Sequence, residues 1–195
     1  KKIVGLIGVN DVVRKEAKKV LKTLKDNSIE TIMLTGDNAE TANVIAKEIG
    51  IENVIAEVMP SEKANIIKKL KTEDKKVMMC GDGINDSPAL ANSDVGISIN
   101  SGTDIAMDSS DVILMKDDLT KILDLISISK HTIKNIKQNL FWAFFYNMLM
   151  IPIAIGLLKP LGISINPMIA SFAMVISSLT VILNSLRLRH IKILL

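Results

Sequence analysis

The segment Val77-Met78-Met79-Cys80-Gly81-Asp82-Gly83-Ile84-Asn85-Asp86 joins an apolar run to a loop of glycines and acids. An apolar run that ends in glycine is typical of a buried strand that opens into a loop. The loop carries two carboxylates and an amide within six residues, and oxygen ligands of this kind suit Mg²⁺. For these six residues alone, an ordinary Asx/Gly surface turn is the alternative.

The sequence around this segment, residues 1–129, alternates apolar runs with amphipathic stretches. This alternation predicts an α/β domain with a parallel sheet covered by helices on both faces. In such sheets, ligands bind beyond the carboxyl ends of the strands. We expect strands at residues 3–9, 29–34, 53–58, 77–80, 95–99 and 112–115, and helices at about 14–27, 40–49, 60–71 and 87–91.

Two more polar features follow expected strands. Thr35-Gly36-Asp37 comes directly after an apolar run, where a hydroxyl beside the N–H groups of the next helix can hold a phosphoryl oxygen. A helix N-cap at Asp37 or Asn38 is the simpler alternative. Lys63 opens the helix at 60–71, where a cation opposes the helix dipole and calls for an anion nearby. A solvated surface lysine is the alternative for that position.

Composition divides the chain in two. Seven of the 24 basic residues and none of the 21 acidic ones lie in residues 130–195, so this part is basic and apolar while residues 1–129 are acidic. The basic residues flank apolar runs and form no single stripe, so we expect a membrane and no nucleic acid. The one cysteine, Cys80, excludes a disulfide framework within the chain, and we expect it to be a small buried apolar residue.

Residues 130–195 contain two uncharged runs of 19 residues, 140–158 and 168–186, each long enough to cross a hydrocarbon core of about 30 Å. Periodic apolar residues at 119–138 predict a helix that leads into the first run. The basic residues lie mostly before and after the two runs, so the positive-inside rule predicts a transmembrane hairpin with both ends in the cytoplasm.

Polar residues lie within both runs. Burying a polar side chain in the membrane interior costs free energy, so such residues indicate a role in packing or function. The first contains Tyr146-Asn147, and the second contains Met174, Ser177 and Ser178 on one helical face. A thioether is a soft donor that favours Cu(I), whereas Ser and Asn also serve ordinary helix–helix packing. From the spacing of these residues alone, helix–helix packing is favoured over metal binding.

Thr35-Gly36-Asp37, Pro60 to Lys63 and the loop from Gly81 to Asp86 resemble the haloacid-dehalogenase-like phosphorylation domain of P-type ATPases, over nearly all of residues 1–129. The resemblance implies use of ATP and Mg²⁺. It implies that Asp82 and Asp86 lie at the Mg²⁺ site, and that phosphoryl transfer involves Thr35, Gly36, Asp37, Lys63, Asn85 and Asp86. For Thr103 and Asp104, which also lie in a matching stretch, a helix N-cap remains the preferred interpretation.

The membrane segment resembles the copper-transporting branch of that family, through Tyr146-Asn147 and the Met-x-x-Ser-Ser pattern that begins at Met174. The resemblance implies a Cu⁺ site of Tyr146, Asn147, Met174 and Ser178, with Ser177 less certain. It also implies export of Cu(I) across the cell membrane. The implied partners are the rest of such an ATPase, the lipid bilayer and a copper chaperone.

The phosphorylated aspartate of that family stands in an Asp-Lys-Thr-Gly motif, which these 195 residues do not contain. We therefore expect the chain to be the C-terminal portion of a longer pump, with the phosphorylation domain at 1–129 and the membrane hairpin at 130–195, and to be inactive alone. A zinc, cadmium or lead pump of the same family is one alternative. A membrane-anchored, non-catalytic binding or regulatory module is the other.

Overall fold

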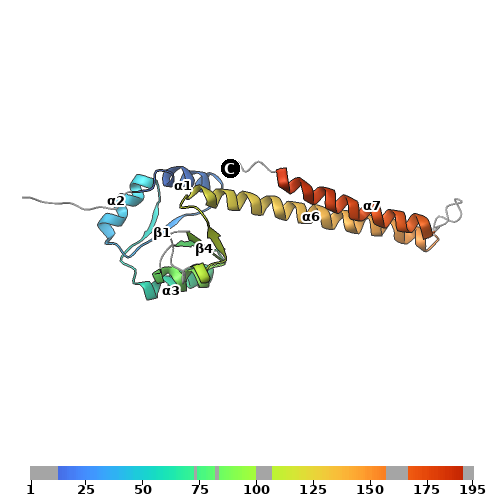
Figure 1. Cartoon of the computed structure of the whole chain (residues 1–195). Helices are drawn as coiled ribbons and strands as arrows, with labels where there is room; N and C mark the ends of the chain where they lie inside the picture. Colours follow the sequence, from blue (N-terminus) through green and yellow to red (C-terminus); the bar gives the residue numbers. More distant parts are fainter. Residues whose placement is uncertain (1–12, 73, 82–83, 100–106, 157–166, 191–195) are drawn as a thin grey trace, which may run out of the picture. The chain divides into compact units, whose positions relative to one another are not determined.

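The computed structural model describes residues 13–72, 74–81, 84–99, 107–156 and 167–190. The chain forms two compact units, Lys1–Leu123 and Asp124–Leu195, and each is described by itself (Figure 1). The strand predicted at residues 3–9 lies outside the described residues, as do Asp82, Thr103 and Asp104.

The first unit alternates helices and strands, as the sequence predicts, and all of its strand pairs are parallel. The described strands form two groups, a pair β1-β2 and a three-stranded sheet in the order β3-β4-β5. The elements are α1 (Ala17–Asp26), β1 (Ile32–Leu34), α2 (Ala39–Ile49), β2 (Asn53–Ile55), α3 (Pro60–Thr72), β3 (Met78–Gly81), the 3₁₀ turn η1 (Ile84–Asp86), α4 (Ser87–Asn92), β4 (Val95–Ile99) and β5 (Val112–Leu114).

Two of the strands are three residues shorter than predicted, for local reasons. The strand expected at 29–34 begins only at Ile32, because the N–H of Ile29 bonds to the carbonyl of Leu24 and so closes the end of α1. The strand expected at 53–58 ends at Ile55, because Glu57 adopts a positive φ of 58° and turns the chain. Both strand ends are set by the backbone conformation, which the pattern of apolar residues does not predict.

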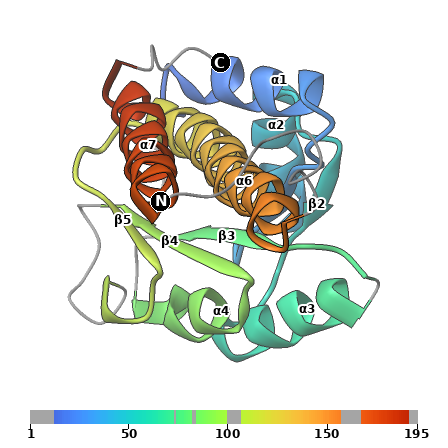
Figure 2. The same ribbon diagram turned by 90° about the vertical axis from the view of Figure 1, so that its right-hand side faces the viewer.

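The core of the first unit lies where α3 and α4 meet β3. Ile67, Met79, Ala89 and Leu90 form a buried cluster there. Figure 2 shows α3 and α4 side by side along one face of the three-stranded sheet. A Cβ on Gly96 in β4 would lie 2.9 Å from the carbonyl oxygen of Leu90, so glycine lets α4 pack directly on the strand. This packing fixes the start of α4, and with it Asp86, relative to the end of β3.

The second unit is a helical hairpin. It contains most of α6 (Thr120–Ala154), then α7 (Pro167–Leu186) and the 3₁₀ turn η3 (Arg187–His190). The Asp118 carboxylate accepts hydrogen bonds from the N–H and hydroxyl of Thr120 and so caps α6. Within the described residues, one helical segment is long and apolar enough to cross a membrane, Ser171–His190. The other predicted span, 140–158, continues into residues that the structure does not describe, and it stays a prediction.

Candidate phosphate site and membrane-helix polar residues

The segment after β3 forms one side of the candidate site. Asp86 precedes the first residue of α4, but its side chain makes no capping bond to that helix. Instead, Asp86 Oδ1 accepts a hydrogen bond from Nζ of Lys63 at 2.7 Å. A Cβ on Gly81 would lie 2.7 Å from Asp86 Oδ2, so the carboxylate rests against the end of β3 only because residue 81 is glycine.

Lys63 lies in the first turn of α3, and the side chains of Lys63 and Asp86 are each only 14% exposed. A cation at this end of a helix is unfavourable alone, and the Asp86 carboxylate offsets it. The alternative of a solvated surface lysine is therefore wrong. The sequence predicted an anion near Lys63 but not its identity. In this structure the anion is the Asp86 carboxylate, which belongs to the loop that carries the predicted Mg²⁺ ligands.

Thr35, Gly36 and Asp37 follow β1 and form a compact turn of their own. Thr35 Oγ1 donates to Asp37 Oδ2 at 2.8 Å and accepts from the N–H of Asp37 at 3.1 Å. The cap of α2 is Asn38, whose side chain accepts from the N–H of Thr41 at 2.8 Å. Of the two capping residues proposed from the sequence, Asn38 is thus the correct one. This leaves Thr35 and Asp37 outside the cap.

A short backbone path connects the two groups of residues. Val58 donates its N–H to the carbonyl of Thr35, and Lys63 donates its N–H to the carbonyl of Met59. The Thr35 turn and the start of α3 are therefore linked through residues 58 and 59. Among the described residues, no hydrogen bond joins Thr35 or Asp37 to Lys63 or Asp86 directly. Asn85 is exposed beside Asp86.

Ser87, which follows Asp86, is not among the candidate residues predicted from the sequence. Its hydroxyl is buried next to Asp86, and it is the one buried side-chain polar atom within the described part of the chain that has no hydrogen-bond partner. Buried polar groups normally have partners, so this hydroxyl at the edge of the loop is an exception. The Ser-Pro dipeptide after the acidic loop was the available signal, but it reads equally well as a helix start.

A further carboxylate fixes the beginning of β3. Asp94 Oδ2 accepts from the N–H of Val77 at 2.9 Å, and Nζ of Lys71 and Nζ of Lys76 lie 3.5 and 3.7 Å from its Oδ1. The hydrogen bond from Val77 lowers the pKa of Asp94 below its ordinary value of 3.8, and the two lysines act in the same direction. Asp94 is therefore charged at neutral pH and links the residues that precede β3 and β4.

The oxygen donors that the structure describes in this loop are of the type that binds a hard cation such as Mg²⁺. Asp86 and Asn85 supply carboxylate and amide oxygens at the carboxyl end of β3, and the predicted ligand Asp82 precedes them in the same loop. Within the described residues, no three His, Cys, Asp or Glu side chains gather at one point. A complete Mg²⁺ site therefore needs Asp82 together with oxygens from outside this set, such as those of a phosphoryl group or water.

The predicted copper residues do not form a closed cluster in this chain. Tyr146 is partly buried, with its hydroxyl 3.4 Å from Thr180 Oγ1 of α7. Met174 is 75% exposed, and Asn147 and Ser178 are also exposed. The Ser178 hydroxyl donates to the carbonyl of Met174 in its own helix at 3.1 Å. Met174 and Ser178 thus share an exposed face of α7, whereas Tyr146 faces the joint between the two helices.

That joint is held by a network of amides that the sequence analysis did not predict. Asn135 is buried and donates to the carbonyl of Asn184 at 2.7 Å. Asn139 donates to Asn135 Oδ1 at 3.1 Å and to the hydroxyl of Ser185 at 2.8 Å, and its side-chain Oδ1 accepts from Nδ2 of Asn184 at 2.8 Å. We call Asn135, Asn139, Asn184 and Ser185 the amide network.

Comparison with known proteins places these features in a family context. The family model for haloacid dehalogenase-like hydrolases matches residues 1–94. The copper-exporting P-type ATPase of Bacillus subtilis is 50% identical over 96% of this chain, and the probable copper-importing P-type ATPase A of Enterococcus hirae is 49% identical over 96%. The chain spans 23% and 25% of the length of these two relatives.

A solved structure resembles most of this chain. The crystal structure of a zinc-transporting PIB-type ATPase in the E2.Pi state matches 91% of this chain with a TM-score of 0.81 and 30% sequence identity, and the match covers 28% of that protein. The likeness and the family model bear out the predicted fold class, a haloacid-dehalogenase-like α/β domain of parallel strands, and one described helical segment, Ser171–His190, is apolar enough to cross a membrane.

Proposed function

Because the chain is a homologue of part of the heavy-metal P-type ATPases, we propose that it serves as the phosphate-handling domain and last membrane hairpin of an ATP-driven copper pump. The observation that carries the catalytic part is the Lys63–Asp86 pair at the carboxyl end of β3. A mostly buried ammonium beside an acidic loop suits the binding of a phosphoryl group, since phosphoryl transfer depends on positioning and charge neutralisation.

In this proposal the phosphoryl group is carried by an aspartate outside these residues. Lys63 neutralises its charge, and Asp86 holds the lysine in place. The Thr35 hydroxyl turns its proton from Asp37 to a phosphoryl oxygen, while Gly36 lets the backbone come close. Asp82, Asp86 and Asn85 would hold Mg²⁺, which supplies positive charge to the phosphoryl oxygens.

The transported ion in this proposal is Cu⁺, a substrate of the membrane helices. Met174 offers a soft thioether, and Tyr146, Asn147 and Ser178 offer oxygens. Because Met174, Asn147 and Ser178 are exposed in this chain, they are available to ligands from other membrane segments. We also propose that both ends of residues 130–195 face the cytoplasm, which follows from the distribution of their basic residues.

A zinc pump is the nearest alternative, because one structural neighbour transports zinc. Residues 130–195 contain no Asp or Glu that could hold the harder Zn²⁺ ion, which favours copper. A non-catalytic membrane module is the other alternative. It requires that the protein lack a phosphorylated aspartate, so finding the Asp-Lys-Thr-Gly motif in the same polypeptide would exclude it.

The deciding experiment compares Cu⁺ with Zn²⁺ in the full-length protein that carries this chain. We expect Cu⁺ to accelerate turnover of the phosphoenzyme and Zn²⁺ to leave it unchanged. Met174→Ala should lower Cu⁺ binding, whereas Met148→Ala removes a thioether of similar exposure, 72% against 75%, and should not. Equal loss in both variants would contradict the ligand role of Met174. Uptake of Cu⁺ into inside-out vesicles would establish export.

The catalytic half has its own test. Asp82→Asn in the full-length protein should abolish Mg²⁺-dependent formation of the phosphoenzyme, because an amide is a poorer Mg²⁺ ligand than a carboxylate. Asp26→Asn, at the end of α1, makes the same chemical change at an exposed position and should leave phosphorylation intact. Normal phosphoenzyme in Asp82→Asn would contradict the role given to that residue.

A further inference from the structure

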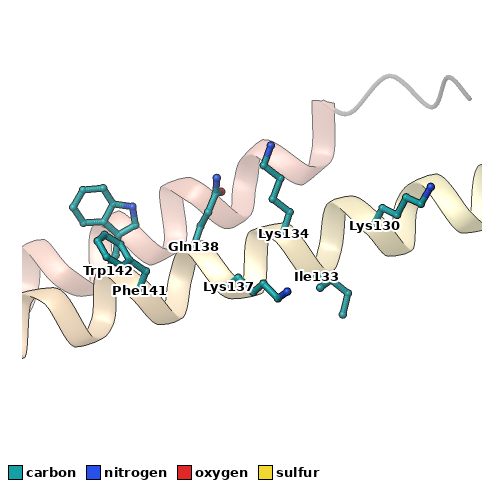
Figure 3. A pocket seen from close by; sticks show the side chains of 7 residues that line it. All are labelled: Lys130, Ile133, Lys134, Lys137, Gln138, Phe141 and Trp142. Carbon is teal, nitrogen blue, oxygen red and sulfur yellow. The ribbon is translucent and has the colours of Figure 1, made fainter.

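A groove of about 480 Å³ runs along α6 in the second unit. Its lining comes from one helix, and Figure 3 shows the side chains along the outside of that helix. Three of them are lysines, Lys130, Lys134 and Lys137, and the groove ends in the aromatic rings of Phe141 and Trp142. The groove thus combines three positive charges with two aromatic rings at one end.

The lysines are unpaired cations that share one helical face. Lys130, Lys134 and Lys137 are separated by four and three residues, the spacing that aligns side chains on a helix. All three are exposed, and none forms an ion pair with another residue in the described part of the chain. Residues 130–195 contain no Asp or Glu at all, so no acid of this segment can neutralise them.

The groove lies where α6 passes from charged to uncharged sequence. Lys137 is the last charged residue of the helix, and Phe141 and Trp142 stand in the next turn. Aromatic rings are enriched at the membrane–water interface, and lysine side chains reach from the apolar region to the headgroup level. If α6 enters the bilayer as proposed above, the groove therefore lies at the level of the cytoplasmic headgroups.

The opposite face of α6 is already occupied. Asn135 and Asn139 point toward α7 through the amide network. The lysines are therefore not part of the joint between these two helices. Covering them with an apolar helix would bury three unpaired charges, which is strongly unfavourable. An anionic ligand satisfies the same face without that cost.

We propose that this groove binds the anionic headgroup of a phospholipid from the cytoplasmic leaflet. The phosphate of the lipid accepts from the three ammonium groups, Gln138 adds an amide donor, and Trp142 and Phe141 contact the glycerol and upper acyl chains. Basic pockets of this kind, placed beside transmembrane helices, suit anionic lipids. The proposal rests on the membrane placement of α6, but it is independent of copper transport and of phosphorylation.

The experiment titrates the purified full-length protein with phosphatidylglycerol and with phosphatidylcholine and counts bound lipids by native mass spectrometry. We expect phosphatidylglycerol to bind in preference, and the Lys130→Gln/Lys134→Gln/Lys137→Gln variant to weaken that binding by about tenfold or more. Replacing the three lysines by arginine should preserve the preference. Inorganic phosphate at the same concentration should not displace the lipid.

A matched control changes three exposed lysines of the first unit, Lys18→Gln/Lys22→Gln/Lys68→Gln, and should keep the wild-type preference. The proposal is overturned if the groove variant keeps the wild-type preference, if the control loses as much, or if free phosphate competes equally with the lipid. Thermal unfolding of each variant checks that it folds. If the glutamine variant does not fold, the arginine variant decides, because loss of the lipid preference in a folded protein that keeps all three charges would overturn the proposal. Because the readout is lipid binding, it separates this proposal from the failure of copper transport.

Discussion

At the scale of single residues, the site depends on one contact that a side chain would destroy. Gly81 lets the Asp86 carboxylate lie against the end of β3, and that position brings Asp86 within 2.7 Å of Lys63. Gly50, by contrast, is needed for its positive φ of 84° and has no neighbouring atom within 4 Å of an added Cβ. The two glycines have different physical roles, and the same substitution should separate them.

Gly81→Ala should destabilise the first unit by roughly 1–3 kcal/mol through overpacking, and should also reduce phosphoenzyme formation because it displaces Asp86. Gly50→Ala should cost about 1 kcal/mol by forcing a left-handed conformation, without an effect on phosphorylation. Thermal unfolding and phosphorylation assays on the full-length protein measure both quantities. A Gly81→Ala protein that phosphorylates normally would show that the position of Asp86 is not critical.

A second prediction at this scale concerns the stability that the Lys63–Asp86 ion pair contributes. Lys63→Met should destabilise the protein by roughly 2–4 kcal/mol, because it leaves the Asp86 carboxylate mostly buried without its partner. The double variant Lys63→Met/Asp86→Leu should recover much of that stability, since no charge is then left unpaired. Neither variant should form normal phosphoenzyme. Equal stability of the single and double variants, measured by denaturant unfolding, would argue against a coupled pair.

At the candidate site, the residues could be named from the sequence but their contacts could not, and the roles given to the residues stay predictions. Their positions near the ends of expected elements, together with the resemblance to a phosphorylation domain, singled out Thr35, Lys63 and Asp86. The partnership of Lys63 with Asp86 depends on how α3 packs against α4, a long-range contact that local patterns do not contain. The unpaired hydroxyl of Ser87 is likewise a result of burial, which becomes visible only in three dimensions.

At the scale of elements, the strands were predicted by type and order, but two began or ended elsewhere because of turns at Ser28 and Glu57, both with positive φ. Neither residue is a glycine, so the sequence carried no signal for these turns. The helical hairpin was predicted from its uncharged runs. The amide network that joins its two helices was not, because spacing alone does not show which faces meet.

Asn139→Leu should weaken the pairing of α6 and α7, since it removes the residue with most partners in the amide network. A hydrogen bond between membrane helices is worth about 0.6 kcal/mol on average, so loss of several should cost roughly 1–2 kcal/mol. Asn147→Leu provides the contrast, because Asn147 is exposed and outside the network. Unfolding in mixed detergent micelles should be easier for Asn139→Leu only, while copper binding should fall for Asn147→Leu.

The start of the central sheet should respond to pH through Asp94. Its pKa is lower when folded than when unfolded, so it stabilises the fold above its ordinary value of 3.8 and loses this effect as the pH falls through the lower, folded pKa. Asp94→Asn should therefore lower the thermal unfolding temperature at neutral pH, and the difference from wild type should shrink under acid conditions. A difference that is independent of pH would point to lost packing instead of lost charge.

At the scale of the whole chain, one element belongs to both units. α6 runs without interruption from Thr120 to Ala154, across the boundary between Leu123 and Asp124. An unbroken helix is stiff, so in the proposed pump it is a direct connection between the phosphate-handling domain and the membrane segment. This connection can be tested by breaking the helix at an exposed position.

Ile128→Pro should interrupt α6, because proline removes a backbone hydrogen bond and clashes with the preceding turn. We expect ATP-dependent phosphorylation to persist and stimulation of turnover by Cu⁺ to fall by about tenfold. Ile128→Ala keeps the helix and should keep the stimulation, since Ile128 is 46% exposed and contributes little packing. If the proline variant responds to Cu⁺ as wild type does, the signal between the units does not travel through this helix.

The amide network has a mechanical consequence. Three of its hydrogen bonds cross from one helix to the other, and sliding either helix by a single turn would break these three bonds together. α6 and α7 should therefore tilt and rotate as one rigid body throughout a transport cycle. In the proposed pump, an ion path would then open and close at the outer surface of this pair, where Met174 is exposed.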